Sequence, residues 1–116
     1  MGFIYQIRYF PEPGRQYSPQ DFINGLTDKG EQARIKQHHD SLRCLYPQYW
    51  QEHLNIKLIV KGLYQLTSGP IRSYICIDGG ILVVVYMCRK VKGKIRLIDK
   101  RRAINNMNRY FEGRND

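Results

Sequence analysis

The side chains best suited to chemistry in this sequence are basic, and they lie close to β-rich segments of its second half. Arg72 stands near the start of one such run, and the turn after the next run holds Arg89, Lys90, Lys92 and Lys94. The start of one antiparallel strand lies beside the end of its partner, so we expect Arg72 to meet this turn. Two further lysines, Lys57 and Lys61, belong to the preceding run. Several cations at one concave sheet edge suit the negative charge of a phosphodiester.

The charge of the whole chain agrees with this interpretation. The 116 residues include 19 Lys and Arg against 10 Asp and Glu, which gives a formal net charge of +9. Residues 1–56 carry 6 basic and 6 acidic side chains, so the entire surplus falls in residues 57–116. Between Arg89 and Arg102, with Arg96 among them, eight of fourteen residues are basic and Asp99 is the only acid. Such a patch predicts a polyanion or an acidic protein as partner, although a solvated face of an ordinary domain has the same composition.

Other kinds of catalytic signature are missing from the sequence. There is no Gly-rich phosphate loop, no GxSxG, no HExxH and no acid pair inside an apolar strand. Cys44, Cys76 and Cys88 form no CxxC pair, and the adjacent His38 and His39 would point in different directions on a helix. We therefore expect reduced, buried thiols, no metal site and no cofactor.

Length and composition predict a single folded domain over residues 1–116. Hydrophobic residues make up 42% of the chain, which is enough for one core. The longest apolar run, from Gly80 to Cys88, is far shorter than the roughly 20 residues needed to cross a bilayer. The first ten residues lack the basic segment and apolar stretch of a secretory signal. We therefore expect no membrane contact and a cytoplasmic location.

The first half of the chain predicts one strand and two helices. Residues 3–10 alternate with a period of 2 and are rich in aromatic and β-branched side chains, which is typical of a strand. Ser18 followed by proline predicts the start of a short helix over residues 19–26. Thr27 or Asp28 can cap a second, longer helix, and the two helices should form a hairpin.

Short β-rich runs separated by glycine follow, and they predict strands at residues 56–60, 62–66, 71–77 and 81–87. Asp78-Gly79 is a strong hairpin signal, because such turns need positive φ. The last strand is apolar without alternation, so we expect it to be central and covered by the helical hairpin. Asp99 can cap a final helix with an apolar stripe. The predicted fold is α+β, with an N-terminal strand, a helical hairpin packed on an antiparallel β-meander, and a C-terminal helix.

Several short motifs follow one another along the second half of the chain. They are Gly62-Leu63-Tyr64-Gln65-Leu66, then Arg72 before Ser73-Tyr74-Ile75, then Asp78-Gly79-Gly80-Ile81-Leu82-Val83-Val84 and the basic turn. In this order they resemble the RelE/HigB superfamily of toxin proteins, most of all its phage-derived, HigB-like branch. The motifs typical of that family are, in order, close to "GLYELR, IR, YF, DG, IVLLH, F, KK, TP", and a final helix follows them. The resemblance covers roughly residues 18–112 and implies a small RelE/ParE-like fold.

The resemblance implies the toxin of a type II toxin–antitoxin system, an mRNA interferase that enters the ribosomal A site and cleaves mRNA there. It places a catalytic arginine at Arg72, which would stabilise negative charge on the phosphate during attack by the ribose 2′-hydroxyl. The second basic cluster of the family falls on Arg89, Lys90 and Lys92. A lysine crowded by other cations gives up its proton more readily, so Lys90 is the first candidate for the general base of a metal-independent endoribonuclease.

The same resemblance and the charge pattern imply RNA contacts and partners. The expected RNA-binding side chains are Lys57, Lys61, Lys94, Arg96 and Tyr86, and Tyr86 either stacks on a base or packs in the sheet. The expected partners are the ribosome and mRNA, together with a cognate antitoxin. We expect that antitoxin to be a small DNA-binding protein whose acidic segment covers the basic face or an apolar groove of the toxin.

The sequence departs from the family pattern at three places. Gln65 replaces a glutamate or lysine, Tyr86 replaces a histidine often found near the end of the long strand, and Lys92-Gly93-Lys94 replaces a Thr-Pro. Two other functions fit the same fold, namely a ParE-like inhibitor of DNA gyrase and a nucleic-acid-binding module without turnover. The ParE-like relatives generally lack the arginine and the basic turn, so the sequence favours RNA cleavage.

Overall fold

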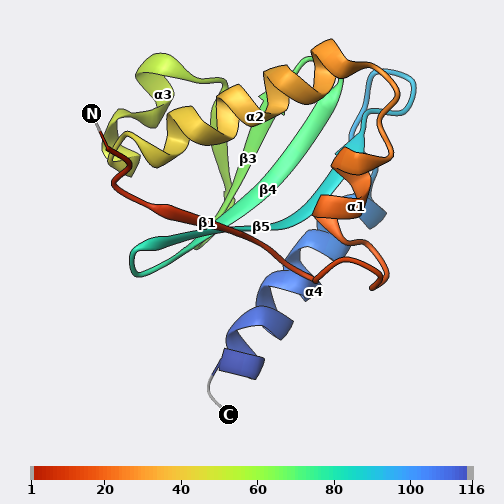
Figure 1. Cartoon of the computed structure of the whole chain (residues 1–116). Helices are drawn as coiled ribbons and strands as arrows, with labels where there is room; N and C mark the ends of the chain where they lie inside the picture. Colours follow the sequence, from red (N-terminus) through yellow and green to blue (C-terminus); the bar gives the residue numbers. More distant parts are fainter. Residues whose placement is uncertain (1, 115–116) are drawn as a thin grey trace.

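The computed structural model describes residues 2–114 and shows a small α+β domain around one 5-stranded mixed sheet (Figure 1). The strands are β1 (Gln6–Tyr9), β2 (Ile56–Val60), β3 (Leu63–Ser68), β4 (Ile71–Asp78) and β5 (Ile81–Arg89). They lie in the order β1-β5-β4-β3-β2. Strands β2 to β5 form the expected antiparallel meander, and β1 pairs parallel with β5.

The first two helices begin where the sequence places their caps. They are α1 (Pro19–Asn24), α2 (Lys29–Arg43), the short turns η1 (Pro47–Tyr49) and α3 (Trp50–His53), and α4 (Leu97–Arg114). The Ser18 side chain accepts from the backbone N–H of Asp21, and the Asp28 side chain accepts from those of Gly30 and Glu31. These bonds satisfy N–H groups that the first turn of a helix leaves without a partner. The predicted caps of the first two helices are therefore confirmed.

Helices α2 and α4 cover opposite faces of the sheet (Figure 1). The core on the α2 face includes Ile35, Leu42, Leu82, Val84 and Met87. The core on the α4 face includes Ala103, Tyr110, Val83, Val85 and Cys88. Strand β5 is covered on both faces as expected, but the helical hairpin supplies only one of the two covers, because α4 supplies the other.

A β-bulge interrupts the pairing of the two central strands. Tyr74 of β4 pairs with Tyr86 of β5, whereas the next residue, Ile75, pairs with Val84, so Val85 has no partner in β4. One extra residue shifts the alternation of side chains by one position. Val85 and Tyr86 consequently both pack on the α4 face.

A side chain of α4 satisfies the backbone at this bulge. The Asn106 Nδ2 donates to the Val85 carbonyl over 2.9 Å, and Asn106 is buried. A buried carbonyl without a donor costs about 1–3 kcal/mol. Asn106 therefore ties α4 to β5 and stabilises the register beyond the bulge, where Met87 faces α2 and Cys88 faces α4.

Asn106→Leu should lower the free energy of unfolding by about 1–3 kcal/mol, because the Val85 carbonyl loses its buried donor. Asn105 on the same helix is exposed, so Asn105→Leu is the matched control. That control should change stability by less than about 0.5 kcal/mol. Urea denaturation measures both changes, and equal stability of the two variants would contradict the role given to Asn106.

A chain of polar side chains is buried between α2 and the sheet. The His39 Nδ1 lies 3.0 Å from the Tyr9 hydroxyl, and the His39 Nε2 lies 2.9 Å from the Ser73 hydroxyl. Burial lowers the pKa of His39 to about 4, and the Asp40 carboxylate opposes this shift only in part. His39 is therefore neutral in the folded protein at a pH where it is charged in the unfolded chain.

Stability should fall as the pH drops from 6.5 toward 4, because the unfolded chain then takes up a proton at His39 while the folded protein does not. An ordinary pKa of 6.5 and a folded pKa of about 4 make this loss roughly 3 kcal/mol. His39→Gln removes the titration, so urea denaturation across this pH window should show a smaller pH dependence. His53 is exposed, and a His53→Gln control should keep the wild-type dependence. The same pH dependence in His39→Gln and the wild type would refute this assignment.

Several details differ from the expectations, besides shifts of one or two residues at the ends of predicted elements. Strand β1 covers only Gln6–Tyr9, and the turns η1 and α3 follow α2. Helix α4 begins before Asp99, so Asp99 lies in its first turn and does not cap it. Cys44 is exposed, whereas Cys76 and Cys88 are buried.

No helix within residues 2–114 has the length and apolar character needed to span a bilayer.

Candidate functional site

Arg72 is buried in β4, and its guanidinium is anchored to the backbone. Only 8% of the residue is exposed. Its Nη1 donates to the carbonyl of Gly69 over 2.7 Å and to that of Ile71 over 3.1 Å. The Nε and Nη2 atoms take no part in these two bonds. The backbone therefore fixes the orientation of the guanidinium and leaves part of its donor fork outside these bonds.

The start of β4 and the end of β5 lie side by side, as the sequence predicts. Arg72 pairs with Cys88 in the strand register. One residue beyond β5, the Lys90 N–H donates to the Pro70 carbonyl over 2.9 Å. The backbone of the basic turn therefore leaves the sheet directly beside Arg72.

The side chains of Arg72 and Arg89 do not converge, contrary to expectation. Arg72 shares the α4 face with Cys88, and neighbouring positions of a strand point to opposite faces. Arg89 accordingly points to the α2 face, where its Nη2 donates to the Glu31 carboxylate over 2.6 Å. The sheet therefore separates the two arginines that the sequence placed together.

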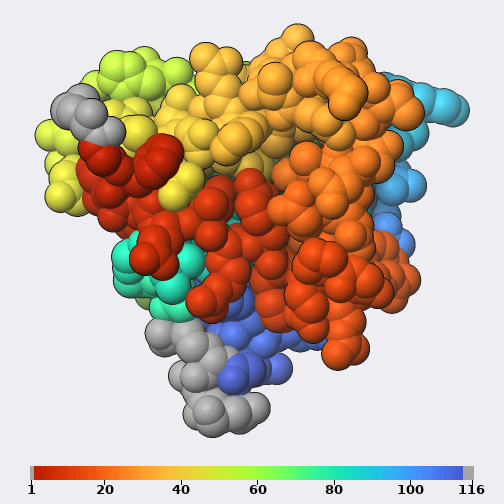
Figure 2. Space-filling model, viewed as in Figure 1, coloured from red at the N-terminus to blue at the C-terminus, as the bar shows by residue number. Residues whose placement is uncertain are grey.

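A two-residue hairpin forms the basic turn, residues 90–95. Val91 and Lys94 exchange two backbone hydrogen bonds, and Lys92 and Gly93 between them have φ of 52° and 76°. Such a turn needs positive φ at both central positions. Lys92 and Lys94 are exposed, and Lys90 is partly buried; within residues 2–114 none of the three makes an ion pair. Figure 2 shows the turn, in light blue, protruding from the margin of the molecule.

A network around Asp99 joins the start of α4 to β5. The Tyr86 hydroxyl donates to Asp99 Oδ1 over 2.6 Å, and the Arg96 Nε donates to Asp99 Oδ2 over 3.0 Å. Arg102 Nη1 lies 3.9 Å from Asp99 Oδ1 and completes the network. Burial, followed by the hydrogen bond to Asp99, raises the pKa of Tyr86 to about 12. Tyr86 is buried and packs in the sheet, and Arg96 is held at the protein surface by Asp99.

Lys57 and Lys61 are both exposed, but they lie toward opposite ends of β2. Lys57 pairs with Gln65, whose Oε1 accepts from the buried Tyr74 hydroxyl. Gln65 in turn pairs with Tyr74, so Lys57, Gln65 and Tyr74 form one row across β2, β3 and β4. Tyr74 is only two positions from Arg72 on the same face of β4. Lys57 therefore lies at the Arg72 end of the sheet. Lys61 lies in the turn to β3, at the other end. The structure therefore brings Lys57 toward Arg72 and leaves Lys61 apart.

A cavity of about 520 Å³ lies along the part of β5 that β1 does not cover. Ligand sites commonly have volumes of roughly 300–1,000 Å³. β1 pairs only with residues 81–84 of β5, whereas the cavity is lined from Tyr86 onward. The cavity, called here the β5 cavity, is lined by the arginines Arg15, Arg89 and Arg96 and by the aromatic ring of Tyr17.

Cys88 connects the β5 cavity with Arg72. Its side chain contributes to the cavity wall and pairs with Arg72 in the register. Burial raises the pKa of the Cys88 thiol to about 12; Asp99 acts in the same direction, and Arg72 and Arg96 act against it. The charges of Arg72 and Arg96 therefore both act on the Cys88 sulfur. Arg72 does not line the cavity itself, because it lies on β4, the strand next to the β5 wall.

Sequence reasoning assigned no role to Arg15 and Tyr17 of the β5 cavity. Both lie in the loop between β1 and α1, where prolines and a glycine interrupt any helical or strand pattern. Without a periodic pattern, the direction of a side chain does not follow from its position in the sequence. The remaining signal in the sequence was a tyrosine two positions after an arginine, and these residue types together are typical of single-stranded nucleic-acid surfaces.

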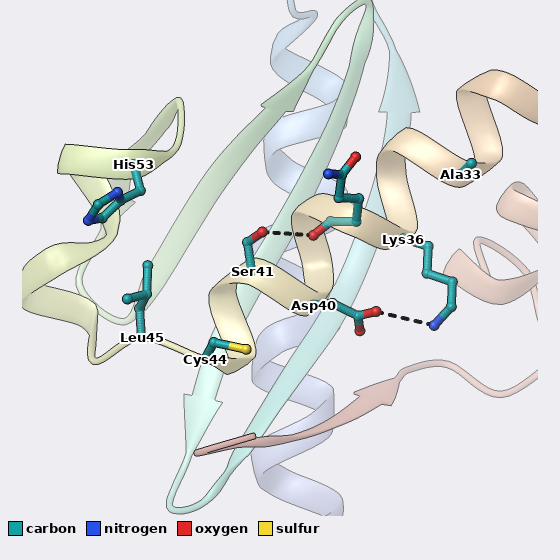
Figure 3. A pocket seen from close by; sticks show the side chains of 8 residues that line it. Ala33, Lys36, Asp40, Ser41, Cys44, Leu45 and His53 are labelled. Carbon is teal, nitrogen blue, oxygen red and sulfur yellow. Dashed lines mark hydrogen bonds and ion pairs between the residues drawn. The ribbon is translucent and has the colours of Figure 1, made fainter. Parts of the chain in front are cut away.

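A second hollow, of about 650 Å³, lies on the outer side of α2 beside α3 (Figure 3). Leu45 and His53 contribute to its wall, and the Lys36–Asp40 ion pair lies at its rim with a distance of 3.3 Å. None of the predicted site residues lines it. We therefore place the candidate site at the smaller β5 cavity, where the cations gather.

Within residues 2–114 there is no group of three His, Cys, Asp or Glu side chains arranged to hold a metal ion.

Neither a protein-family model nor a curated protein matches this sequence.

Asp99→Ala should lower the free energy of unfolding by roughly 1–3 kcal/mol, because the buried Tyr86 hydroxyl loses its acceptor. Glu112→Ala, at an exposed acid of the same helix, is the matched control and should have little effect. The double variant Asp99→Ala/Tyr86→Phe removes both partners, so its loss should be smaller than the sum of the two single losses. Thermal and urea denaturation measure these changes, and strictly additive losses would argue against a direct Tyr86–Asp99 interaction.

Proposed function

We propose that this protein is the toxin of a type II toxin–antitoxin pair, a RelE/HigB-like mRNA interferase that cleaves mRNA on the ribosome in the cytoplasm. The motif resemblance supports this function. So does the element order of strand, helical pair, antiparallel meander and final helix, which is the order the resemblance implies. The net charge of +9, concentrated in the second half of the chain, favours docking on RNA.

The anchored guanidinium of Arg72 is the observation that carries the proposal. Two backbone carbonyls fix it at the sheet end from which the basic turn departs. A donor that is already oriented before the substrate arrives stabilises developing charge without reorganisation. The Nε and Nη2 atoms of Arg72 make neither of these bonds, and in this proposal they bind the phosphate.

The proposed reaction uses groups of the RNA and of this chain. The ribose 2′-oxygen attacks the adjacent phosphorus, and the bond from phosphorus to the 5′-oxygen breaks. The products are a 2′,3′-cyclic phosphate and a 5′-hydroxyl. Lys90 accepts the proton of the 2′-hydroxyl and passes a proton through solvent water to the leaving 5′-oxygen, so no proton is gained or lost overall. Arg72 binds the non-bridging oxygens, where negative charge accumulates.

The other cations have positioning roles in this proposal. Lys92 and Lys94 are exposed and lack carboxylate partners within residues 2–114, so they are free to bind phosphates of mRNA or rRNA. The same lysines would attract an acidic segment of a cognate antitoxin. Phosphate contacts of this kind position a strand and carry no sequence information.

Arg72→Lys should reduce mRNA cleavage by about 100-fold or more, because lysine keeps the charge but loses the planar donor fork. Primer extension on a defined mRNA in a translating extract measures the cuts, and a parallel sample without ribosomes tests their dependence on the ribosome. Lys36→Ala removes an exposed cation on the outer side of α2 and should leave the cuts unchanged. Circular dichroism should show that both variants remain folded.

Full cleavage by a folded Arg72→Lys protein would overturn the role of Arg72. A folded wild-type protein that makes no cuts would overturn mRNA cleavage itself. A DNA supercoiling assay with gyrase then separates the two alternatives, because only a ParE-like protein inhibits that reaction.

A further inference from the structure

Tyr17 combines an exposed ring with an unfavourable backbone. It is 37% exposed and has φ of 64°, a conformation that residues with a Cβ seldom adopt. Such a conformation costs roughly 1–2 kcal/mol for an ordinary residue. Strained residues of this kind persist where the surroundings hold them and are concentrated at binding sites.

Two neighbouring side chains hold the Tyr17 ring. The Arg102 guanidinium carbon lies 4.5 Å from the ring centroid, and the Tyr86 ring meets it edge-on at a centroid distance of 5.8 Å. Tyr86 and Arg102 both belong to the Asp99 network. The loop side chain is therefore fixed to β5 and α4, and its remaining exposed surface is presented to the solvent.

Tyr17 stands between two cavities. One is the β5 cavity of about 520 Å³, which contains Arg15, Arg89 and Arg96. The other measures about 400 Å³ and contains Arg102 and Arg109 of α4. An aromatic surface with arginines on both sides has the chemistry that binds single-stranded RNA, in which bases stack on rings and phosphates bind guanidinium groups.

The carboxylates in the β5 cavity do not prevent anion binding. Asp21 accepts from the Gly14 N–H over 2.7 Å, and the buried Asp99 accepts from the Tyr86 hydroxyl and from the Arg96 Nε. The side chains of Arg15 and Arg96 are 72% and 53% exposed although each also pairs with an acid. A guanidinium has five N–H donors, so each arginine keeps donors for a phosphate.

We propose that Tyr17 stacks on a base of the bound RNA and that Arg15 and Arg96 bind the adjoining phosphates in the β5 cavity. This inference rests on the proposed function and extends it, because it adds a base-binding subsite that is separate from the phosphate contact of Arg72. Tyr17 is a positioning residue in this scheme: it sets which nucleotide lies beside Arg72.

Fluorescence of an uncleavable RNA tests this subsite. The probe is a set of short single-stranded RNAs, 2′-O-methylated throughout, with 2-aminopurine at each position in turn. Stacking on Tyr17 should quench the fluorescence at one position. Tyr17→Gly removes the ring and suits the positive φ, so this variant should stay folded. It should lose that quenching and bind about 5- to 100-fold more weakly.

Two further variants sharpen the test. Tyr17→Phe keeps the ring and should restore quenching and affinity. Tyr46→Gly removes an exposed tyrosine that does not line either cavity and should behave as the wild type. Wild-type quenching and affinity in Tyr17→Gly, or no quenching at any position with the wild type, would overturn the subsite.

Primer extension with the same proteins separates this inference from the proposed function. Ribosome-dependent cuts that are unaffected by Tyr17→Gly, together with unaltered RNA binding, would remove the subsite and leave the mRNA interferase in place. Stacking that depends on Tyr17, without any cuts by the wild type, would support the subsite and overturn the enzyme.

Discussion

The β-bulge at Val85 determines which side chains meet at the candidate site. Without the extra residue, Tyr86 and Cys88 would face α2, and Arg89 would face α4. With it, Tyr86 and Cys88 join Arg72 on the α4 face, and Arg89 turns to α2. A buried amide of α4 donates to the bulge carbonyl, so the position of that helix and the register of β5 depend on each other. The Asp99 network and the wall of the β5 cavity both follow from this single irregularity.

Two kinds of cation lie around the candidate site. The guanidinium groups of the arginines have partners within the protein. Two backbone carbonyls bind that of Arg72, and carboxylates bind those of Arg89 and Arg96. Lys92 and Lys94 in the protruding turn are exposed and have no ion pair within residues 2–114. Fixed donors suit the stabilisation of charge at one phosphate, whereas exposed lysines suit long-range attraction of a polyanion. This division is consistent with an enzyme that first docks on RNA and then orients one bond.

The meander and the first two helix caps followed from local signals, because glycine turns, Ser18 and Asp28 act within a few residues. The faces of β5 did not follow, since an uninterrupted valine run contains no alternation that would reveal a bulge. The convergence expected for Arg72 and Arg89 failed for that reason. The cap expected at Asp99 also failed, because its partners come from β5 and from the turn before α4. The contact between Tyr86 and Asp99 joins residues from two different elements, so local sequence does not reveal it.

We propose that the α4 face at the start of β4 meets the phosphate of the RNA. Electron cryomicroscopy of this protein on a translating ribosome, with an mRNA that is 2′-O-methylated at the cleavage codon, tests it most directly. We expect a phosphate within about 3.5 Å of the Arg72 Nε or Nη2 atoms, with the basic turn on rRNA or mRNA. A complex in which the RNA contacts the α2 face, or in which Arg72 lies far from every phosphate, would contradict it.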